Sequence, residues 1–257
     1  MKTIQDDSMR NFFTVTLVWV SVLLWSTVAQ GKVLFYDNFD DAKIDPKYEM
    51  KNHPGKWVEK GGVISQTNPT PGDHTYLIMP GGFAEPHTGL VQIRIDDWTD
   101  GDLARAGIGF RLDPGDGGGY AFLIHHFLTN MEFLNDHIAW KQNDTPPPFG
   151  VVEKGKWYWM KAEISKSGFT GKIWPDNEKE PTKWLLDSKF DFGAERVVTG
   201  NVGLNGGSSS GAPAATVVSF DNFAVCEKAD ECIPKVILAV EPAGKLSTTW
   251  GAIKMKY

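Results

Sequence analysis

The chain has 257 residues, of which 41% are hydrophobic and 23% are charged, with 27 glycines and 15 prolines. This composition excludes the fibrous and the intrinsically disordered classes. The formal net charge of -6 provides no basic surface for nucleic acid, so nucleic-acid partners are not expected.

The first 29 residues have the pattern of a secretory signal peptide. Lys2 and Arg10 precede the apolar run from Phe12 to Trp25, and small residues follow it up to Ala29. The run is too short for a comfortable membrane span. We expect cleavage after Ala29, no stable membrane span in the mature chain, and a secreted, cell-surface or periplasmic location. The alternative is a retained N-terminal anchor.

Strand patterns dominate after residue 32. The segments 57–60 and 63–66 predict a hairpin around Gly61 and Gly62. Further strands are expected at residues 33–39, 90–98, 106–112, 120–127, 131–142, 157–165, 168–174, 183–190, 201–205 and 215–225. No helical periodicity exceeds about two turns. The fold class is therefore all-β, a two-sheet antiparallel sandwich.

The triplet Asp-Asn-Phe occurs twice, starting at Asp37 and at Asp221. The flanking residues do not align, and no period of 20–50 residues is present, so the chain is not a repeat. We expect the two segments to be the first and last strands of one sandwich, lying side by side.

The only cysteines, Cys226 and Cys232, follow the last strong strand. In an exported chain this pair predicts a disulfide, which would stabilise the fold by about 2 kcal/mol for so short a loop.

The order of the motifs resembles a known family. The segments VLFYDNFDD, KWVEKGGVIS, GLVQIRI, RAGIGFRL, GGYAFLI, GKWYWMKAEI, NVGLNG and VVSFDNFAV follow one another over roughly residues 32–227. This succession resembles the LamG-like jelly-roll domains of the concanavalin A-like lectin and glucanase superfamily. The resemblance implies one domain over residues 30–227 and a C-terminal tail, 228–257, that is either an extra strand or a sorting segment.

The superfamily includes carbohydrate-binding modules, adhesion domains and glycoside hydrolases, so the fold does not settle the function. Its laminarinase-type hydrolases carry E-x-D-x-x-E on one strand, whereas Glu132 and Asp136 here have a different spacing and no third acid. We therefore expect an exported module that binds carbohydrate without catalysis. The alternatives are a glycoside hydrolase or polysaccharide lyase, and an adhesion domain that binds an extracellular protein. In the enzyme, the general base would be one of His125, His126 and His137, paired with an acid such as Asp136 or Glu163.

A binding face is expected on the solvent side of one concave sheet. An aromatic plate beneath a sugar ring, with charged groups for its hydroxyls, would come from the outward rows of several strands. The residues expected to bind the ligand are Arg111, His125, Asp136, Trp159, Lys161 and Glu163. The segment 143–149 is expected beside the groove, where three prolines would present Phe149. An ordinary solvated sheet face is the alternative.

The resemblance also implies a structural Ca²⁺ ion that joins the two chain ends. It would be bound by a main-chain carbonyl near Asp37, a carbonyl of Gly62 and the carboxylate of Asp221. Calcium favours such oxygen ligands, and it would stabilise the native state by mass action. The alternative is that Asp37 and Asp221 only cap strand ends.

Overall fold

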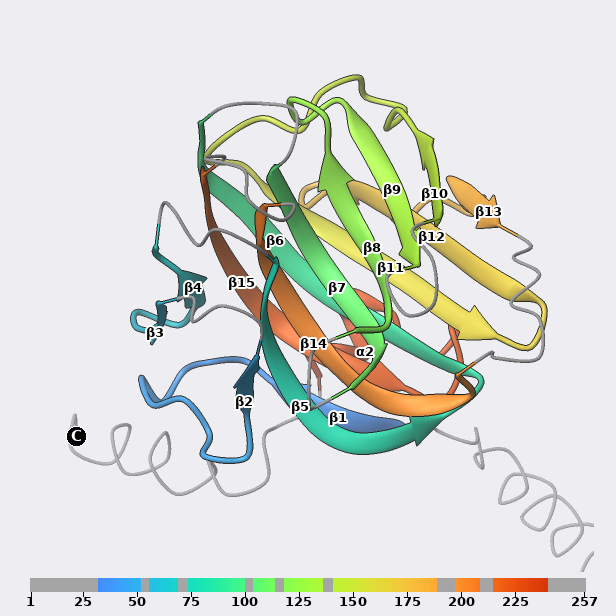
Figure 1. Cartoon of the computed structure of the whole chain (residues 1–257), viewed down its shortest axis with the longest axis horizontal. Helices are drawn as coiled ribbons and strands as arrows, with labels where there is room; N and C mark the ends of the chain where they lie inside the picture. The colour runs from blue at the N-terminus through green and yellow to red at the C-terminus, as the bar shows by residue number, and fades with distance from the viewer. Residues whose placement is uncertain are drawn as a thin grey trace, which may run out of the picture. The chain divides into compact units, whose positions relative to one another are not determined.

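The structure, a computed structural model, describes residues 32–51, 56–68, 74–99, 104–113, 118–135, 141–188, 197–208 and 215–239. All of these residues belong to one compact unit, Lys32–Tyr257. They form two antiparallel sheets packed face to face (Figure 1), which confirms the all-β sandwich. The segment predicted to be a signal peptide lies outside the described residues.

Sheet A contains eight strands in the order β13-β12-β11-β6-β15-β4-β3, and β1 also pairs with β15. Its strands are β1 (Val33–Asp37), β3 (Trp57–Glu59), β4 (Ile64–Gln66), β6 (His87–Thr99), β11 (Trp157–Ser165), β12 (Gly168–Pro175), β13 (Leu186–Ser188) and β15 (Ala215–Cys226).

Sheet B contains seven strands in the order β10-β9-β8-β7-β14-β5-β2 and lies in front of sheet A in Figure 1. Its strands are β2 (Glu49–Lys51), β5 (His74–Ala84), β7 (Ala104–Leu112), β8 (Tyr120–His125), β9 (Asn130–Asn135), β10 (Lys141–Thr145) and β14 (Thr199–Ser208).

The core lies between the two sheets and follows from the alternation of side chains along each strand. Ile93 and Ile95 of β6, Ile108 and Phe110 of β7 and Met160 of β11 are all fully buried in one cluster. Burial of each such side chain stabilises the fold by about 1.5–3 kcal/mol.

The first and last strands lie side by side, as predicted. β1 pairs with β15 in antiparallel register, with Asp37 opposite Phe223. The hydroxyl of Tyr36 donates a hydrogen bond of 2.6 Å to Asn222 Oδ1. β4 pairs with an earlier part of β15 than β1 does, and β15 has an irregular register between Asp221 and Ala224. The two ends of the domain are thus joined along one strand.

Three strands were not expected from the sequence: β2, β5 and β10. The longest of them, β5, contains Pro80, Gly81 and Gly82, a combination typical of a turn. It remains a strand because Asn201 Oδ1 accepts hydrogen bonds from the amides of both glycines, at 3.1 and 3.4 Å. A side chain from the neighbouring strand thus replaces part of the regular ladder.

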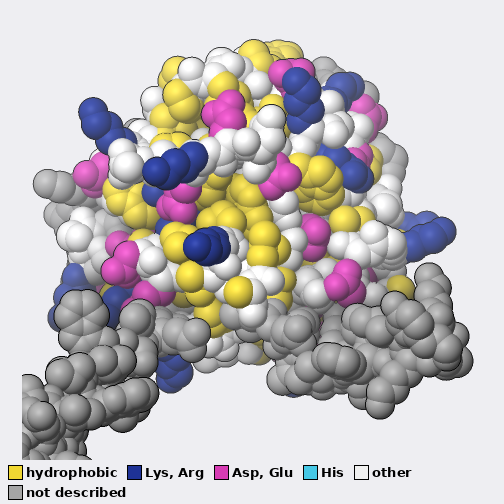
Figure 2. All heavy atoms as spheres, turned by 180° about the vertical axis from the view of Figure 1, so that it is seen from behind, with side chains coloured by type: hydrophobic (Ala, Val, Ile, Leu, Met, Phe, Trp, Pro, Cys, Tyr) yellow, Lys and Arg dark blue, Asp and Glu magenta, His cyan; other side chains and the backbone are white. Residues whose placement is uncertain are grey.

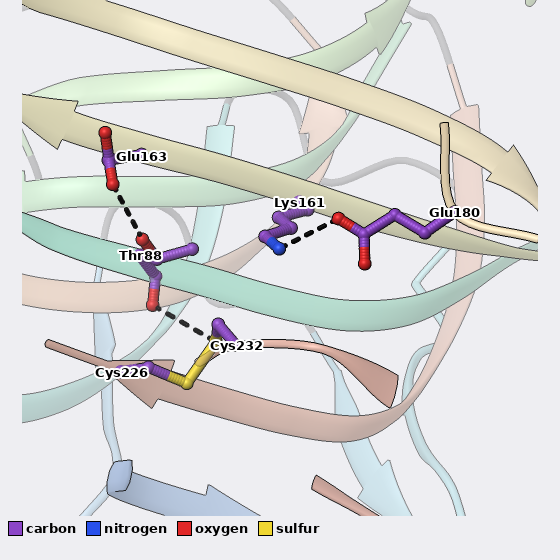
Figure 3. The surroundings of a disulfide bond; sticks show 6 residues. All are labelled: Thr88, Lys161, Glu163, Glu180, Cys226 and Cys232. Atoms are coloured by element: carbon purple, nitrogen blue, oxygen red, sulfur yellow. Dashed lines mark hydrogen bonds and ion pairs between the residues drawn. A yellow bond between two sulfur atoms is a disulfide. The ribbon is translucent and has the colours of Figure 1, made fainter. Parts of the chain in front are cut away.

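The predicted disulfide between Cys226 and Cys232 is present, with 5.6 Å between the Cα atoms. It holds the start of the tail against sheet A, where Cys232 Sγ lies 3.8 Å from the carbonyl oxygen of Thr88 (Figure 3). A short helix, α2 (Pro234–Ile237), follows. Within its described part the tail contains this helix and no strand, and residues 240–257 lie outside the described residues. No helix in the described part of the chain has the length and hydrophobicity to cross a membrane.

Candidate functional site

The residues predicted to bind a ligand do not share one sheet. Arg111 and His125 belong to β7 and β8 of sheet B. β11 of sheet A carries three others, namely Trp159, Lys161 and Glu163. These three alternate with core residues of β11, so they lie on the side of sheet A that faces away from sheet B. The prediction of one shared concave sheet is therefore wrong, and Asp136 lies outside the described residues.

The outer face of sheet A is covered by other parts of the same chain. Trp159 is buried against Cys232 and Ile237 from the tail. Lys161 Nζ lies 2.9 Å from Glu180 Oε1, and burial lowers the pKa of this lysine. Trp159 and Lys161 are therefore not exposed, contrary to expectation. Figure 2 views the molecule from this side and shows hydrophobic side chains gathered over the middle of the face.

The third residue on this strand, Glu163, is half-buried. Thr88 Oγ1 donates a hydrogen bond of 3.4 Å to its carboxylate (Figure 3), and burial raises the pKa of the Glu163 carboxyl. Within the described parts of the chain, sheet A thus has no open aromatic surface around Trp159.

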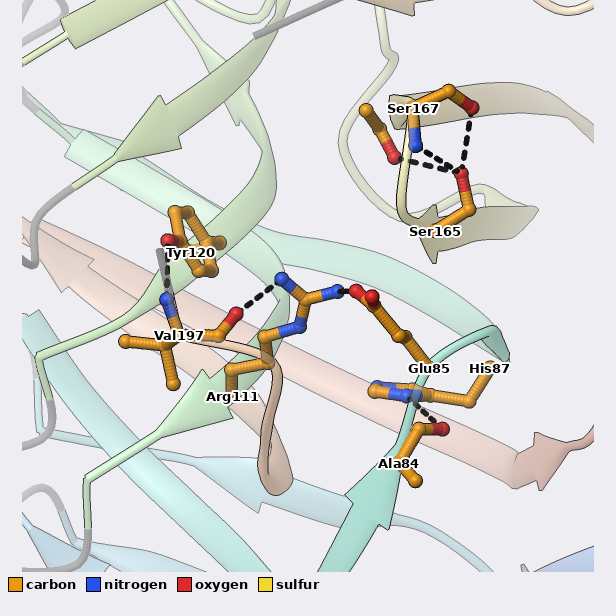
Figure 4. Close-up of polar contacts among 9 residues, drawn as sticks. Ala84, Glu85, His87, Arg111, Tyr120, Ser165, Ser167 and Val197 are labelled. Carbon is orange, nitrogen blue, oxygen red and sulfur yellow. Dashed lines mark hydrogen bonds and ion pairs between the residues drawn. The ribbon is translucent and has the colours of Figure 1, made fainter. Parts of the chain in front are cut away.

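Arg111 is buried because a bulge reverses its direction. Asn201 and Val202 are consecutive, yet they pair with Leu112 and Phe110, which leaves Arg111 as the extra residue of β7. Its φ of +51° is in the left-handed region. The guanidinium forms an ion pair with Glu85 and donates to the carbonyl oxygen of Val197 (Figure 4). The predicted outward position of Arg111 is therefore wrong.

His125 belongs to a buried cluster of charged groups on the outer face of sheet B. Arg105 Nε donates to Glu132 Oε1 at 3.0 Å, and His125 Nδ1 lies 2.6 Å from Glu132 Oε2. Burial raises the pKa of Glu132, but His125 and Arg105 together lower it by more, and the net shift is downward. His125 Nε2 is buried and has no hydrogen-bond partner among the described residues.

The turn between β8 and β9, next to this cluster, has an unusual backbone. His126, Phe127 and Leu128 are consecutive non-glycine residues with φ of +41°, +52° and +67°. Each such conformation costs about 1–2 kcal/mol, because Cβ approaches the following carbonyl oxygen. The turn is held by the burial of Leu128 and by a hydrogen bond of 2.9 Å from the Val152 amide to the Leu128 carbonyl. Phe127 is 62% exposed.

Polar side chains close to this turn in the fold contact one another. Asn130 Nδ2 donates to Asp144 Oδ2 at 3.1 Å, and His126 Nε2 lies 3.8 Å from the same oxygen. The side chains of His126 and Asp144 are 34% and 41% exposed. We call His126, Phe127, Asn130 and Asp144 the β8–β9 rim. None of these four residues was predicted as a ligand-binding residue. The only signal was the pair of adjacent histidines, of which His126 faces solvent.

The proline-rich segment has a different role from the one predicted. Phe149 is half-buried, and its ring stacks on Tyr158 with 5.2 Å between the centroids. The prolines thus direct Phe149 into the core boundary, and the exposed aromatic side chain of this region is Phe127.

The residues predicted to bind calcium lie among carboxylates. Asp37 accepts hydrogen bonds from the Phe39 amide at 2.9 Å and from the Tyr48 hydroxyl at 3.3 Å. Burial and the charges of Asp40, Asp176 and Asp37 raise the pKa of Asp221 to about 6. A Cβ on Gly62 would lie 3.3 Å from Asp40 Oδ1, so this turn also adjoins the cluster.

No group of three or more His, Cys, Asp or Glu side chains in the described residues is arranged to hold a metal ion. This finding concerns side chains, whereas the calcium ligands implied by the resemblance are two main-chain carbonyl oxygens and one carboxylate. The calcium site therefore stays a prediction.

The fold has many relatives among solved structures, although no protein-family model matches the chain and no curated protein matches it by sequence. The Emp47p carbohydrate recognition domain aligns with a TM-score of 0.53 and 10% identity, covering 79% of this chain and 100% of that one. The carbohydrate-binding module CBM66 from Bacillus subtilis gives 0.52 and 14%, covering 69% and 94%. The cellulose-induced protein Cip1 gives 0.51 and 12%, covering 76% and 97%. These likenesses show a shared two-sheet β-sandwich fold.

Proposed function

We propose that this protein is an exported module that binds carbohydrate without catalysis, through the β8–β9 rim. The observation that carries the proposal is the exposed aromatic ring of Phe127, which is the middle one of three consecutive residues with left-handed φ. Backbone strain of this kind persists where the surrounding structure enforces it, and it concentrates at functional sites. No family model matches the chain, so its membership of the LamG-like family is part of this proposal.

The chemistry of the rim suits a sugar. A pyranose ring presents C–H groups on one face and hydroxyl groups at its edge. Phe127 offers a flat apolar surface for the first, while the Asp144 carboxylate and the Asn130 amide offer an acceptor and a donor for the second.

Two further observations support the setting. The solved structures with this fold include a carbohydrate recognition domain and a carbohydrate-binding module. The Cys226–Cys232 disulfide fits an oxidising compartment such as the cell exterior or the periplasm.

A glycoside hydrolase is the second candidate, because Asp144 pairs directly opposite Glu132 in the β9–β10 ladder. Side chains at such positions point to the same face, about 5 Å apart at Cβ, which is close to the carboxylate separation of retaining enzymes. However, Glu132 is fully buried and engaged by Arg105 and His125. We therefore favour binding.

A glycan array with the wild-type protein and Phe127→Ala tests the proposal. The variant should lose about tenfold or more in affinity for the glycan that the wild type binds, since an aromatic plate contributes over 1 kcal/mol. Met50→Ala, which truncates another exposed side chain, is the matched control and should bind normally.

Equal binding by Phe127→Ala and the wild type would refute the rim as the site. Release of reducing ends or unsaturated products from the bound glycan, abolished by Asp144→Asn, would show an enzyme instead. A protein partner with no glycan binding would favour the adhesion domain.

A further inference from the structure

Two adjacent histidines join the β8–β9 rim to the buried charged cluster of sheet B. The centroids of the His125 and His126 rings are 3.8 Å apart, with 38° between the two ring planes. His125 is 2% exposed, and its Nδ1 lies 2.6 Å from Glu132 Oε2. The side chain of His126 is 34% exposed and lies beside Asp144. One ring of the pair is thus enclosed by the protein, and the other meets the solvent.

The register of the strands brings the buried cluster next to the polar groups of the rim. Glu132 of β9 pairs with Asp144 of β10. Asn130 of β9 pairs with His125 of β8. Residues directly opposite each other in an antiparallel pair point to the same face of the sheet. The rim and the cluster therefore form one continuous polar array, in which a change of charge at one residue acts on its neighbours.

The carboxylate of Asp144 has two neighbours at the same oxygen. Asn130 Nδ2 donates to Asp144 Oδ2 at 3.1 Å, and His126 Nε2 lies 3.8 Å from that oxygen. A neutral imidazole makes no hydrogen bond at this distance, since N–H···O bonds need about 2.7–3.2 Å. A protonated imidazole has two N–H donors and a positive charge, so it is attracted to the carboxylate and can move onto it. A proton on His126 therefore creates a competitor for this carboxylate.

The charges around the two rings favour a proton on His126 over one on His125. Burial raises the pKa of Glu132, but His125 and Arg105 lower it by more, so this carboxyl is ionised where histidines titrate. Arg105 Nε donates to it at 3.0 Å, so its charge already has a partner. A charge on the enclosed His125 would lose its hydration, and charges on both rings would repel each other. Among the described residues, His126 is the only basic side chain within ion-pair distance of Asp144.

The segment that packs against the β8–β9 turn leaves this balance unchanged. It contacts the turn through the Val152 amide. Its charged side chains have exposed partners of their own, namely Lys156 for Glu153 at 2.7 Å and Asp97 for Lys154 at 3.3 Å. Asp144 is therefore the charged group that governs a protonated His126.

We propose that the β8–β9 rim releases its glycan in mild acid, because protonated His126 takes the Asp144 carboxylate that otherwise binds a sugar hydroxyl. This inference rests on the proposed function and adds regulation by pH to the same site. Because the proton and the glycan compete for one carboxylate, the affinity for the glycan falls as the pH falls through the range of histidine titration, about pH 5–8. A single proton changes the affinity by at most about tenfold per pH unit.

Titration calorimetry of the full chain at pH 7.5 and pH 5, with the glycan that the wild type binds best on the array, tests the proposal. The wild type should bind at least about tenfold more weakly at pH 5. His126→Gln keeps a polar side chain that cannot be charged, so its affinities at the two pH values should agree within about twofold. His74→Gln removes a histidine of β5, which β7 and β14 separate from β8, and should keep the wild-type difference.

Two further measurements separate this mechanism from others. Because His126→Gln retains the acid sensitivity of the fold, its binding at pH 5 shows that unfolding does not cause the loss in the wild type. Crystals of the wild type at pH 5 should show His126 Nε2 within about 3 Å of an Asp144 oxygen. A separation that stays at 3.8 Å at pH 5 would contradict the mechanism.

Two results in solution would also overturn the proposal. One is a wild-type affinity at pH 5 that equals or exceeds the affinity at pH 7.5. The other is a pH dependence that His125→Gln abolishes and His126→Gln retains, because the proton would then belong to the enclosed ring. Absence of any glycan binding at pH 7.5 would instead refute the proposed function, so the two failures are distinguishable.

Discussion

At the scale of single residues, His87 shows how the interior restricts protonation. Its ring is fully buried between Phe83 and Phe110, and Nδ1 lies 3.2 Å from the Ala84 carbonyl oxygen (Figure 4). Burial, together with the charge of Arg111, lowers the pKa of His87 to about 4, against the opposing effects of Ala84 and Glu85. The native state thus holds this imidazole neutral.

The consequence is a loss of stability in acid. The unfolded chain takes up a proton at His87 near pH 6.5 and the native state only near pH 4, so the stabilisation is present above pH 6.5 and declines as the pH falls to 4. The slope is about 1.4 kcal/mol per pH unit within this window. Urea denaturation from pH 7 to pH 4 should give a shallower profile for His87→Phe than for the wild type.

Other groups titrate in the same pH range, so the effect of His87 is the difference between the stability profiles of the wild type and His87→Phe. Burial raises the pKa of Glu59 to about 7, and such a raised acid contributes in the opposite direction, since its stabilisation is lost as the pH rises. His126→Gln, at a partly exposed position, is the control. Parallel profiles for His87→Phe and the wild type would contradict the prediction.

At the scale of elements, the β8–β9 turn has an unfavourable backbone conformation in which the side chain of Phe127 is exposed. Glycine adopts positive φ without the penalty of a Cβ, whereas alanine carries that penalty as phenylalanine does. Phe127→Gly should therefore be more stable than Phe127→Ala by about 1 kcal/mol, although both lose the ring. Chemical denaturation of the two variants measures the difference. A less stable glycine variant would show that the turn is not strained at this residue.

The loop closed by the Cys226–Cys232 disulfide, at the end of β15, also stabilises the fold at this scale. Cys232 and Ile237 cover Trp159 and Trp174 on the outer face of sheet A. Replacement of both cysteines by serine should lower stability by about 2 kcal/mol, because the open loop has more conformational freedom when unfolded. Tryptophan fluorescence should shift to the red as the covering segment loosens. An unchanged spectrum and an unchanged denaturation midpoint would show that the packing alone holds the tail.

At the scale of the whole molecule, the first and last strands meet at a cluster of carboxylates. Asp37, Asp40 and Asp221 come from β1, the following loop and β15, and their mutual repulsion contributes to the raised pKa of Asp221. A cation would relieve this repulsion. The cluster is therefore the place where the calcium prediction can be tested.

Calcium at about 1–5 mM should raise the melting temperature of the chelator-treated protein, since it binds the native state only. Asp221→Asn should abolish that increase, while the variant without calcium should be at least as stable as the wild type at pH 7.5. Asp187→Asn, at an exposed carboxylate of β13, is the control. Equal melting temperatures with and without calcium would refute the site.

Local alternation along the chain determined the sandwich, the inward direction of Ile93 and Ile108 and the two-glycine hairpin. These features depend on neighbouring residues or on one face being apolar. The disulfide was likewise evident from two cysteines six positions apart.

Only the tertiary structure decided which polar side chains remain exposed. Arg111 points inward because the pairing of β7 with β14 skips a residue, and Lys161 is buried because Glu180 from a distant loop covers it. Phe127 is exposed because packing and hydrogen bonds around Leu128 hold the turn in a conformation that its own residues disfavour. Strand periodicity specifies the face of a residue, but exposure depends on segments remote in the sequence that pack on that face.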